Sequence, residues 1–518
     1  MSRRLAPMTV ALLLALSACI GSRGETETAA FRPTYAETEC PSDVASGVVG
    51  DLSCGYLTVL EDRSQPGGRT VRLFVTRVMP AGDVAPDPYF VAGTDIADLL
   101  IYGGLAPAAE RTGRELIMMD ARGVGHSQPS LACPEVDAMS LDVLAAPTDD
   151  PNVRASFLDA VETCYERVTA DGIDPSMYSS GSVALDAVDL REALGFDEWI
   201  VASHGTASRI SFEIARLDPE GVRGLFLDSP DVPEVDPFTE AIEGTRAALD
   251  AVSRACEEDP TCAAEMPDLS GSIDETLELL DASPITIDVP ADAATDAPAT
   301  VVVDDARFLS LLRQMLSDGG SSGGANTPSL IPATVAGVLR GELDSGPGSL
   351  IANVVDDQPY CTGFLPRCTP IHRYSHGALL SYLCRDIVPF VDTDALAATA
   401  ETPAARTAFA ESPFIAACER WDVEPADGAP AVTPTGTPAL VELGRFDPYG
   451  NPALVGDALS EIADATIVEA PGLGHNISPA GCLVDLRSTW LEDPAAKLVG
   501  TACVEVLVPA FIFPKTSG

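Results

Sequence analysis

In the first part of the chain, stretches with the hydrophobic pattern of strands alternate with stretches that have the pattern of helices. Short stretches rich in β-branched and apolar residues, typical of strands, lie at 56–60, 71–75, 89–91, 116–119, 199–201 and 225–227. Helical periodicity is clear over residues 183–194, and Gly195 follows directly as a helix stop. This alternation predicts the α/β class, with a mostly parallel sheet covered by helices.

The pattern changes after residue 230. Residues 231–430 are mostly helical, with Pro and Gly breaks and a low-complexity patch at 317–327. Strand-like stretches return at 439–443 and 465–468. We therefore predict one α/β core formed by residues 40–230 and 431–518, with a large helical cap inserted over residues 231–430.

The N-terminus has the features of a bacterial export signal. In residues 1–18, two arginines precede an apolar stretch that is too short to span a bilayer. The signal ends in Leu-Ser-Ala-Cys, which is similar to a lipobox with cleavage before Cys19 and lipidation of its sulfur. An ordinary signal peptide with an incidental cysteine is the alternative. Residues 19–39 are polar and predict a tether, so we expect a protein anchored by lipid to the outer face of the membrane.

Charge limits the partners of the chain. It has 31 basic and 78 acidic residues and a net charge of −47. Such a chain is repelled by nucleic acid and by anionic lipid surfaces, so we expect no nucleic-acid partner. The acidity fits solubility or adaptation to salt, and steering of cationic substrates is the alternative. Oligomeric state does not follow from the sequence.

Cysteines and histidines bear on disulfides and metals. Of the 13 cysteines, 12 remain after Cys19, and an even number in an exported chain predicts disulfides. We expect sequential pairing, because short loops close most easily. His372 and His376 have the spacing of two ligands on one helix face, but no glutamate follows His372 and no third ligand is near. No metal site and no organic cofactor are therefore predicted.

A candidate nucleophile lies in residues 201–206 (VASHGT), between a strand-like stretch and a helical one. A serine on a sharp strand-to-helix turn, in the pattern Gly-x-Ser-x-Gly, is how α/β-hydrolases present a nucleophile. Ser203 fits the serine of this pattern and Gly205 its second glycine, whereas Val201 replaces the first glycine. A branched side chain at that position predicts crowding between strand and helix.

The partners that a serine nucleophile needs follow in the order Ser, Asp, His. Asp447 follows the strand-like stretch that ends at residue 443, and His475 lies in a Gly-rich loop after the next such stretch. Both loops open at the carboxyl edge of the sheet. The sequence therefore predicts a triad in which Ser203 attacks, His475 moves the proton and Asp447 orients His475.

At the level of motifs, the chain resembles the exported tripeptidyl aminopeptidase and proline iminopeptidase branch of the α/β-hydrolases. The resemblance covers nearly the whole mature chain and is specific as an ordered set. The matching motifs are residues 54–59 (CGYLTV), 120–127 (DARGVGHS), 227–230 (LDSP), 384–386 (CRD), 418–421 (CERW) and the stretch through Cys482 and Cys503. The resemblance implies the α/β-hydrolase fold and a C-terminal part of the tripeptidyl aminopeptidase type.

The resemblance also implies further site residues. The oxyanion donors would be the N–H of His204 and that of Gly93 or Thr94, although Asp95 places a carboxyl group close to them. Asp386, two residues after a cap cysteine, would meet the free amine of the substrate, and a solvated cap charge is the alternative.

These features together predict an exported, lipid-anchored serine hydrolase. It would remove residues from peptide N-termini through an acyl-enzyme. An esterase acting on small acyl substrates is one alternative. The other is a catalytically lapsed hydrolase that serves as a surface binding lipoprotein, which Val201 and the altered oxyanion loop favour.

Overall fold

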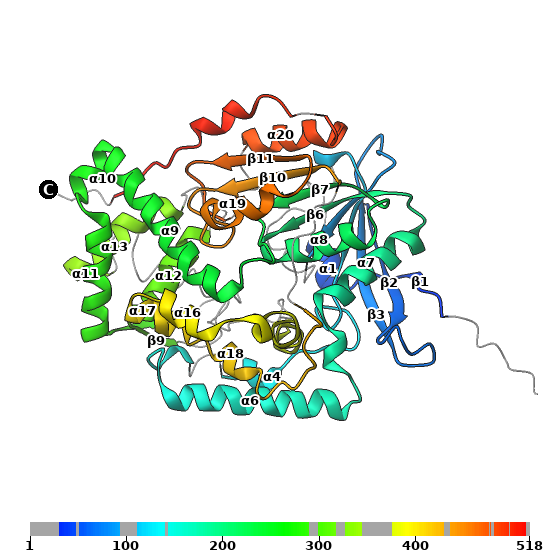
Figure 1. Ribbon diagram of the computed structural model, residues 1–518, viewed down its shortest axis with the longest axis horizontal. Coiled ribbons are helices and arrows are strands. Elements are labelled where there is room, and N and C mark those ends of the chain that lie inside the picture. Colours follow the sequence, from blue (N-terminus) through cyan, green and yellow to red (C-terminus); the bar gives the residue numbers. More distant parts are fainter. Residues whose placement is uncertain are drawn as a thin grey trace, which may run out of the picture.

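A nine-stranded sheet forms the centre of the protein in a computed structural model (Figure 1). The structure describes residues 31–47, 51–93, 111–139, 143–289, 299–317, 327–343, 375–428, 436–475, 477, 481–496 and 498–513. The strand order is β1-β2-β3-β5-β4-β6-β7-β10-β11. No helix among these residues is long and apolar enough to cross a bilayer.

The sheet is antiparallel at one edge and parallel through its centre. Its strands are β1 (Thr34–Thr38), β2 (Asp51–Leu60), β3 (Thr70–Met79), β4 (Tyr89–Ala92), β5 (Leu116–Met119), β6 (Trp199–His204), β7 (Val222–Asp228), β10 (Ala439–Gly444) and β11 (Ala465–Ala470). The strands from β5 through β4, β6, β7 and β10 to β11 run parallel, whereas β1, β2 and β3 pair antiparallel. Every strand predicted from the hydrophobic pattern is present, and the mostly parallel sheet is confirmed.

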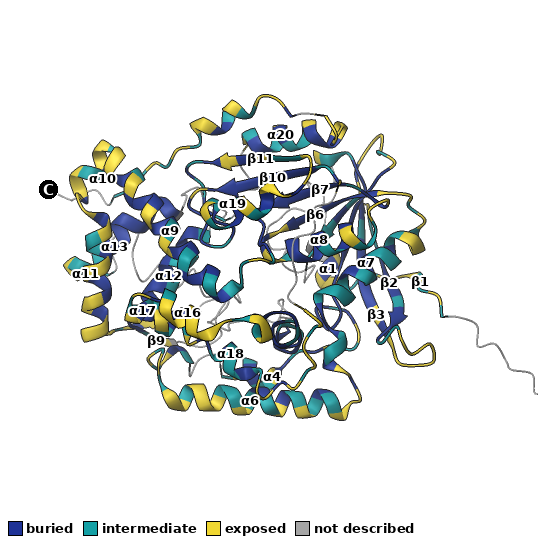
Figure 2. Cartoon of the chain, viewed as in Figure 1, coloured by how far each residue is buried: buried dark blue, intermediate teal, exposed yellow. Residues whose placement is uncertain are grey.

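Both faces of the sheet are covered, which explains why its central strands β5, β6, β7 and β10 are buried (Figure 2). Successive side chains of β6 point to opposite faces. Ile200 and Ala202 pack with α20 (Gly481–Glu492) in one apolar cluster, and Val201 belongs to the other, with α7 (Ser180–Leu194) and α8 (Ser208–Leu217). The same alternation decides where Ser203 points.

The cap lies between β7 and β10 in the sequence and to one side of the sheet in space (Figure 1). Its helices are α9 (Pro237–Glu258), α10 (Pro260–Glu265), α11 (Leu269–Ala282), α12 (Asp305–Ser317), α13 (Ile331–Arg340), α15 (His376–Tyr382), α16 (Thr393–Thr399), α17 (Pro403–Ala405) and α18 (Pro413–Ala417). The cap also holds an antiparallel hairpin, β8 (Ile285–Val289) with β9 (Ala299–Val303), in a region expected to be mostly helical. The remaining α-helices are α1 (Ser42–Gly47), α4 (Pro134–Asp137), α6 (Pro151–Ala170) and α19 (Pro452–Ser460).

One boundary differs from the prediction. Residues 34–38, expected to belong to the tether, form edge strand β1, because their backbone pairs along the whole of β1 with β2. Helix α6 lies in the segment assigned to the core, and it also binds the cap: the Tyr165 hydroxyl donates to the Asp422 carbonyl, and Arg154 donates to the Glu411 carbonyl. The sequence pattern did not distinguish a helix on the sheet from one shared with the cap.

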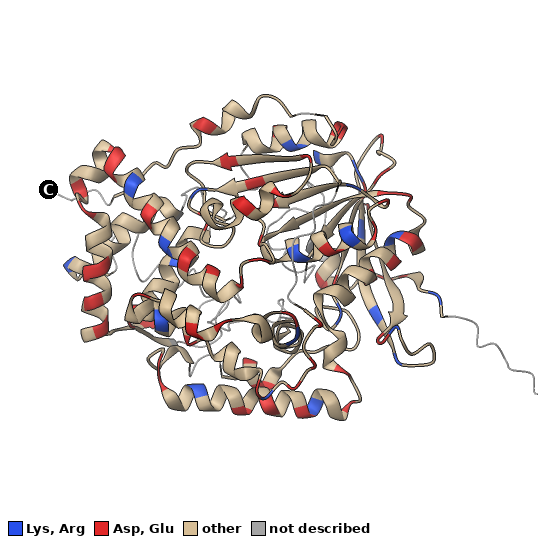
Figure 3. Ribbon diagram, in the orientation of Figure 1, with Lys and Arg blue, Asp and Glu red and all other residues tan. Residues whose placement is uncertain are grey.

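Many of the acidic residues have local structural roles. The carboxylates of Asp150, Asp236 and Asp392 each accept two backbone N–H groups at the first turns of α6, α9 and α16. Such N-caps satisfy donors that have no partner inside the helix. Other acidic side chains are spread along the outer helices (Figure 3).

Disulfides join cysteines that follow one another in the sequence, as predicted. The bonded pairs are Cys40–Cys54, Cys133–Cys164, Cys256–Cys262, Cys384–Cys418 and Cys482–Cys503. Cys361, Cys368 and the candidate lipidation residue Cys19 lie outside the described residues. The sulfurs of Cys133 and Cys164 lie near Glu135 in a metal-like cluster, but they are bonded to each other.

Candidate active site

Strand β6 brings the predicted nucleophile motif to the carboxyl edge of the sheet. The strand continues through Ser203 to His204, which has extended backbone angles of φ −126° and ψ 136°. The left-handed conformation comes next, at Gly205 with φ +55°, and opens a short 3-10 turn before α8. The sharp turn therefore lies two residues after the predicted position.

Ser203 does not occupy the nucleophile position, which corrects the prediction. Its side chain has the same parity on β6 as Val201 and therefore faces α8. The Ser203 hydroxyl donates to Ser208 Oγ at 3.3 Å, and the residue is only 3% exposed. Its hydroxyl thus joins strand β6 to helix α8 in the interior.

Gly205 occupies the place where a nucleophile would stand. A Cβ atom built on Gly205 would lie 3.0 Å from His475 Nε2 and 3.1 Å from His475 Cε1. The residues two before and two after the turn are then Ser203 and Ala207, and both are small, as a close approach of strand and helix requires. Val201 lies further back in the strand, so the predicted crowding at the turn does not arise.

Asp447 and His475 form the second half of the predicted triad. His475 Nδ1 lies 3.1 Å from each carboxylate oxygen of Asp447, whose side chain is fully buried. The backbone N–H of Tyr449 donates to Asp447 Oδ1 at 2.7 Å. The carboxylate is therefore held in place and directs His475 Nε2 towards Gly205.

The backbone N–H and the backbone carbonyl of His475 both form hydrogen bonds that hold its loop in place. The His475 N–H donates to the Leu316 carbonyl at 3.2 Å, and the His475 carbonyl accepts the Ser229 hydroxyl at 2.7 Å. Gly474 is required because a Cβ there would lie 1.8 Å from the Leu316 carbonyl oxygen. Ser229 has φ +49°, a conformation that costs a non-glycine residue about 1–3 kcal/mol. The position of His475 therefore depends on contacts with β7 and with α12.

Aromatic rings in tilted contact, followed by a guanidinium, form a column beside Gly205. The rings of His204 and His475 lie 4.3 Å apart, and those of His475 and Tyr449 lie 4.6 Å apart. The Arg313 guanidinium lies over the Tyr449 ring at 3.7 Å. This column joins the Asp447–His475 pair to cap helix α12.

His204 carries an acidic neighbour of its own. Its Nδ1 lies 3.7 Å from Asp228 Oδ1. Desolvation by the surrounding protein lowers the pKa of His204, but the carboxylates of Asp228 and Asp447 together outweigh this, so the pKa of His204 lies above its ordinary value. His204 is therefore a candidate cation at this edge of the sheet.

The predicted oxyanion donors are only in part where they were expected. Ala92 pairs with Ser203 across β4 and β6, so Gly93 follows directly at the same edge of the sheet. Thr94 lies outside the described residues. In an α/β-hydrolase the second donor is the N–H after the nucleophile position. With Gly205 at that position, the N–H that corresponds to this donor is that of Thr206 and not that of His204.

Asp386 does not face the site, which is a second correction. Its Oδ2 accepts the backbone N–H of Ser180 at 2.9 Å and the Ser180 hydroxyl at 2.8 Å. The residue is 7% exposed, and burial raises the pKa of its carboxyl although the Ser180 hydrogen bonds oppose this. Asp386 therefore joins the cap to the start of α7.

The comparisons with known proteins agree with this fold. Residues 95–254 match the family model described as alpha/beta hydrolase fold. Carboxylesterase B of Mycobacterium tuberculosis (strain CDC 1551 / Oshkosh) is 29% identical over 229 residues, which cover 40% of this chain and 42% of that protein. Serine protease Hip1 of Mycobacterium tuberculosis (strain ATCC 25618 / H37Rv) is 25% identical over 216 residues, which cover 39% of this chain and 41% of that protein. The match thus spans less than half the length of these relatives.

Among solved structures, proline iminopeptidase of Mycobacterium smegmatis is similar, with 13% sequence identity and a TM-score of 0.35. That match covers 82% of this chain and 96% of the other. The family model and the sheet topology confirm the predicted α/β-hydrolase fold.

Proposed function

We propose that this chain with the α/β-hydrolase fold binds a peptide or another small acyl ligand in a hydrolase-type site without a serine nucleophile. The observation that carries the proposal is Gly205, which stands opposite His475 Nε2 where a serine hydroxyl is needed. An acyl-enzyme requires a side-chain hydroxyl whose proton the histidine takes. Within the described part of the chain, no hydroxyl is hydrogen-bonded to His475 Nε2. The predicted acyl-enzyme route through Ser203 therefore lacks geometric support.

A second candidate function keeps chemistry at the same site. The intact Asp447–His475 pair favours it, because a histidine oriented in this way is a competent general base. His475 Nε2 would take a proton from a water whose oxygen attacks the acyl carbon. The tetrahedral intermediate would then expel its leaving group, which receives the same proton. No covalent bond to the protein forms on this route.

Fluorophosphonate labelling separates these functions from a serine hydrolase. We expect the wild-type protein and Gly205→Ala to remain unlabelled, and Gly205→Ser to be labelled at residue 205, as located by mass spectrometry. The alanine variant is the matched control, because it adds the same Cβ without a hydroxyl. Labelling of the wild-type protein at Ser203 or Thr206 would contradict the proposal.

Turnover of a short ester by the wild-type protein decides between binding and water-mediated hydrolysis. Hydrolysis that occurs without labelling and is lost in His475→Ala supports the water route. Absence of turnover, together with retained ligand binding, supports a binding protein.

Two further parts of the proposal concern ligand and location. The names of the relatives, a serine protease and a carboxylesterase, support a peptide or an ester-like ligand. The resemblance to exported aminopeptidases supports a peptide in particular. The five disulfides are compatible with an extracytoplasmic location, and a lipid on Cys19 would hold the protein at the membrane. Cys19→Ala should move the protein from the membrane fraction to the soluble fraction, and an unchanged distribution would refute the anchor.

A further inference from the structure

Arg313 is unusual among the arginines near the site. It projects from α12 and is half-buried. Its guanidinium lies over the Tyr449 ring, and the centre of the Phe409 ring is 5.7 Å from the guanidinium carbon. Within the described residues no carboxylate lies within 4.0 Å of it, and its Nε has no hydrogen-bond partner. Stacking fixes a guanidinium in place but leaves its hydrogen-bond donors free.

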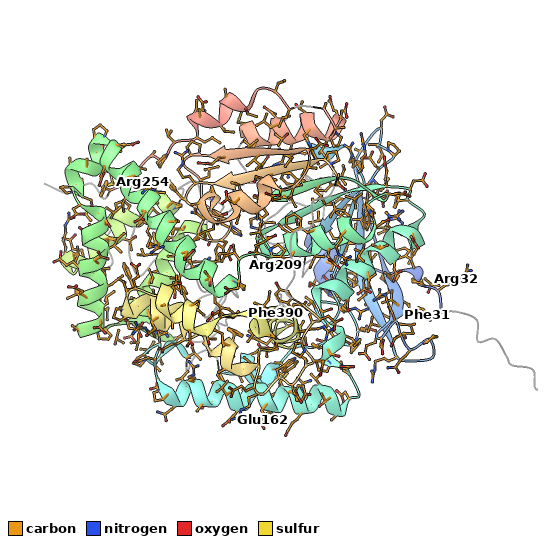
Figure 4. All side chains as sticks on the ribbon, viewed as in Figure 1. Phe31, Arg32, Glu162, Arg209, Arg254 and Phe390 are labelled. Carbon is orange, nitrogen blue, oxygen red and sulfur yellow. A yellow bond between two sulfur atoms is a disulfide. The ribbon has the colours of Figure 1, made fainter. Side chains whose placement is uncertain are left out.

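A shortage of carboxylates does not explain this. The chain has 78 acidic residues against 31 basic ones. Arg209, which lies between the sheet and the cap in the middle of the molecule (Figure 4), pairs with Asp231. Arg487, which is half-buried like Arg313, pairs with Glu442. Arg313, at the end of the column of His204, His475 and Tyr449, therefore differs from these arginines, because it has no carboxylate partner among the described residues.

Glu240 on α9 is an acidic group on which the charge of Arg313 acts. It is 2% exposed, its Oε1 has no hydrogen-bond partner, and the described contacts include no ion pair between it and Arg313. Burial raises the pKa of Glu240 well above its ordinary value, the charge of Asp231 adds to this, and Arg313 lowers it less. Glu240 is therefore the acidic group that a cationic ligand would need at this position.

We propose that Arg313 anchors a carboxylate of the ligand, while the acyl group of the same ligand lies at Gly205. A planar guanidinium matches a carboxylate with two parallel hydrogen bonds. The column links the two ends of this ligand site, because Tyr449 contacts both His475 and Arg313. The inference rests on the proposed function and specifies its ligand as an acyl compound or peptide with a free carboxylate.

Two N-acetylated tripeptide libraries test the anchor, one with free C-terminal carboxylates and one with C-terminal amides. Retention of each library by the full mature protein is measured by affinity selection and mass spectrometry. We expect the carboxylates to bind about 10- to 100-fold more tightly than the amides, because a hydrogen bond to a charged group has that worth. The preference should vanish in Arg313→Met. It should persist in Arg254→Met, a matched exposed arginine on α9 at the edge of the molecule (Figure 4).

Each outcome has one meaning, provided that thermal unfolding shows both variants to be folded. Equal retention of both libraries by the wild-type protein would overturn the carboxylate anchor and leave the binding function intact. Retention of neither library would count against the binding function itself, and the anchor would fall with it.

Glu240→Gln distinguishes a carboxylate ligand from an ammonium ligand. The carboxylate anchor requires Arg313 and not a charge on Glu240, so we expect the carboxylate preference to persist in this variant. An ammonium group would need an ionised Glu240. Tripeptides with free N-termini that bind the wild-type protein whatever their C-terminus, and that fail to bind Glu240→Gln, would overturn the proposal.

Discussion

Gly205 and His475 face each other at the carboxyl edge of the sheet, with His475 Nε2 only 3.0 Å from the place of a Cβ on residue 205. The left-handed backbone at Gly205 and the orientation of His475 by Asp447 are both features of a hydrolase site. The hydroxyl between them is the part that is missing. Most of the predictions below follow from this geometry and from the contacts that maintain it.

The first prediction concerns the stability of the chain with a side chain at residue 205. Both Gly205→Ser and Gly205→Ala should lower the free energy of unfolding by about 1–3 kcal/mol, because φ of +55° disfavours any residue with a Cβ. Urea denaturation measures this. Equal losses in the two variants would assign the cost to the backbone, and a gain in stability in either would contradict the left-handed turn.

The second prediction concerns the His475 loop. Gly474→Ala should lower the free energy of unfolding by at least about 1–3 kcal/mol, because its Cβ would collide with the Leu316 carbonyl oxygen. The same substitution in Gly205→Ser should abolish the labelling gained there, since the loop must move. Gly481→Ala is the matched control: a Cβ there meets no atom within 4 Å, and alanine favours the helix. A neutral Gly474→Ala would refute the close approach.

The third prediction separates the structural role of Asp386 from the role in recognition that the resemblance implied. Asp386→Ala should lower the free energy of unfolding by about 1–3 kcal/mol, because the Ser180 N–H and hydroxyl lose a buried acceptor. Ligand affinity should stay within about twofold of the wild-type value. A large loss of affinity in a variant of unchanged stability would restore Asp386 to the binding site.

The fourth prediction concerns the titration of His204. Proton NMR should give His204 a pKa above its ordinary value in the wild-type protein and a lower pKa in Asp228→Asn, since the Asp228 carboxylate is the main group that raises it. A histidine pKa raised in the folded state adds stability that is fully present below the unfolded value of about 6.5 and is lost as pH rises through the folded pKa. This pH dependence should flatten in Asp228→Asn. An unchanged pKa in that variant would exclude the ion pair.

Local patterns in the sequence were sufficient for the fold class and for half of the site. Strands read from β-branched runs, such as residues 116–119, match the structure, because burial on both faces of a parallel strand requires a continuous apolar run. Asp447 and His475 were found because parallel strands end at one edge of a sheet, so the loops after β10 and β11 must meet. Sequential disulfides followed from the short loops that they close.

Ser203 shows where local patterns fail. The strand continues three residues further than the predicted stretch 199–201, and each added residue of a strand reverses the face to which side chains point. The spacing of Ser203 and Ala207 around Gly205 carried the signal, because both flanking positions are small. The motif Gly-x-Ser-x-Gly requires a serine, so matching the sequence to this motif could not identify Gly205 as the residue at the nucleophile position. The α/β-hydrolase fold, the strand order along the chain and the Asp447–His475 pair were thus determined by the sequence itself, through periodicity and the order of its loops. Only the tertiary structure decided which backbone position faces His475 Nε2 and whether Asp386 and Arg313 have partners, because those relationships depend on the packing of segments that are distant along the chain.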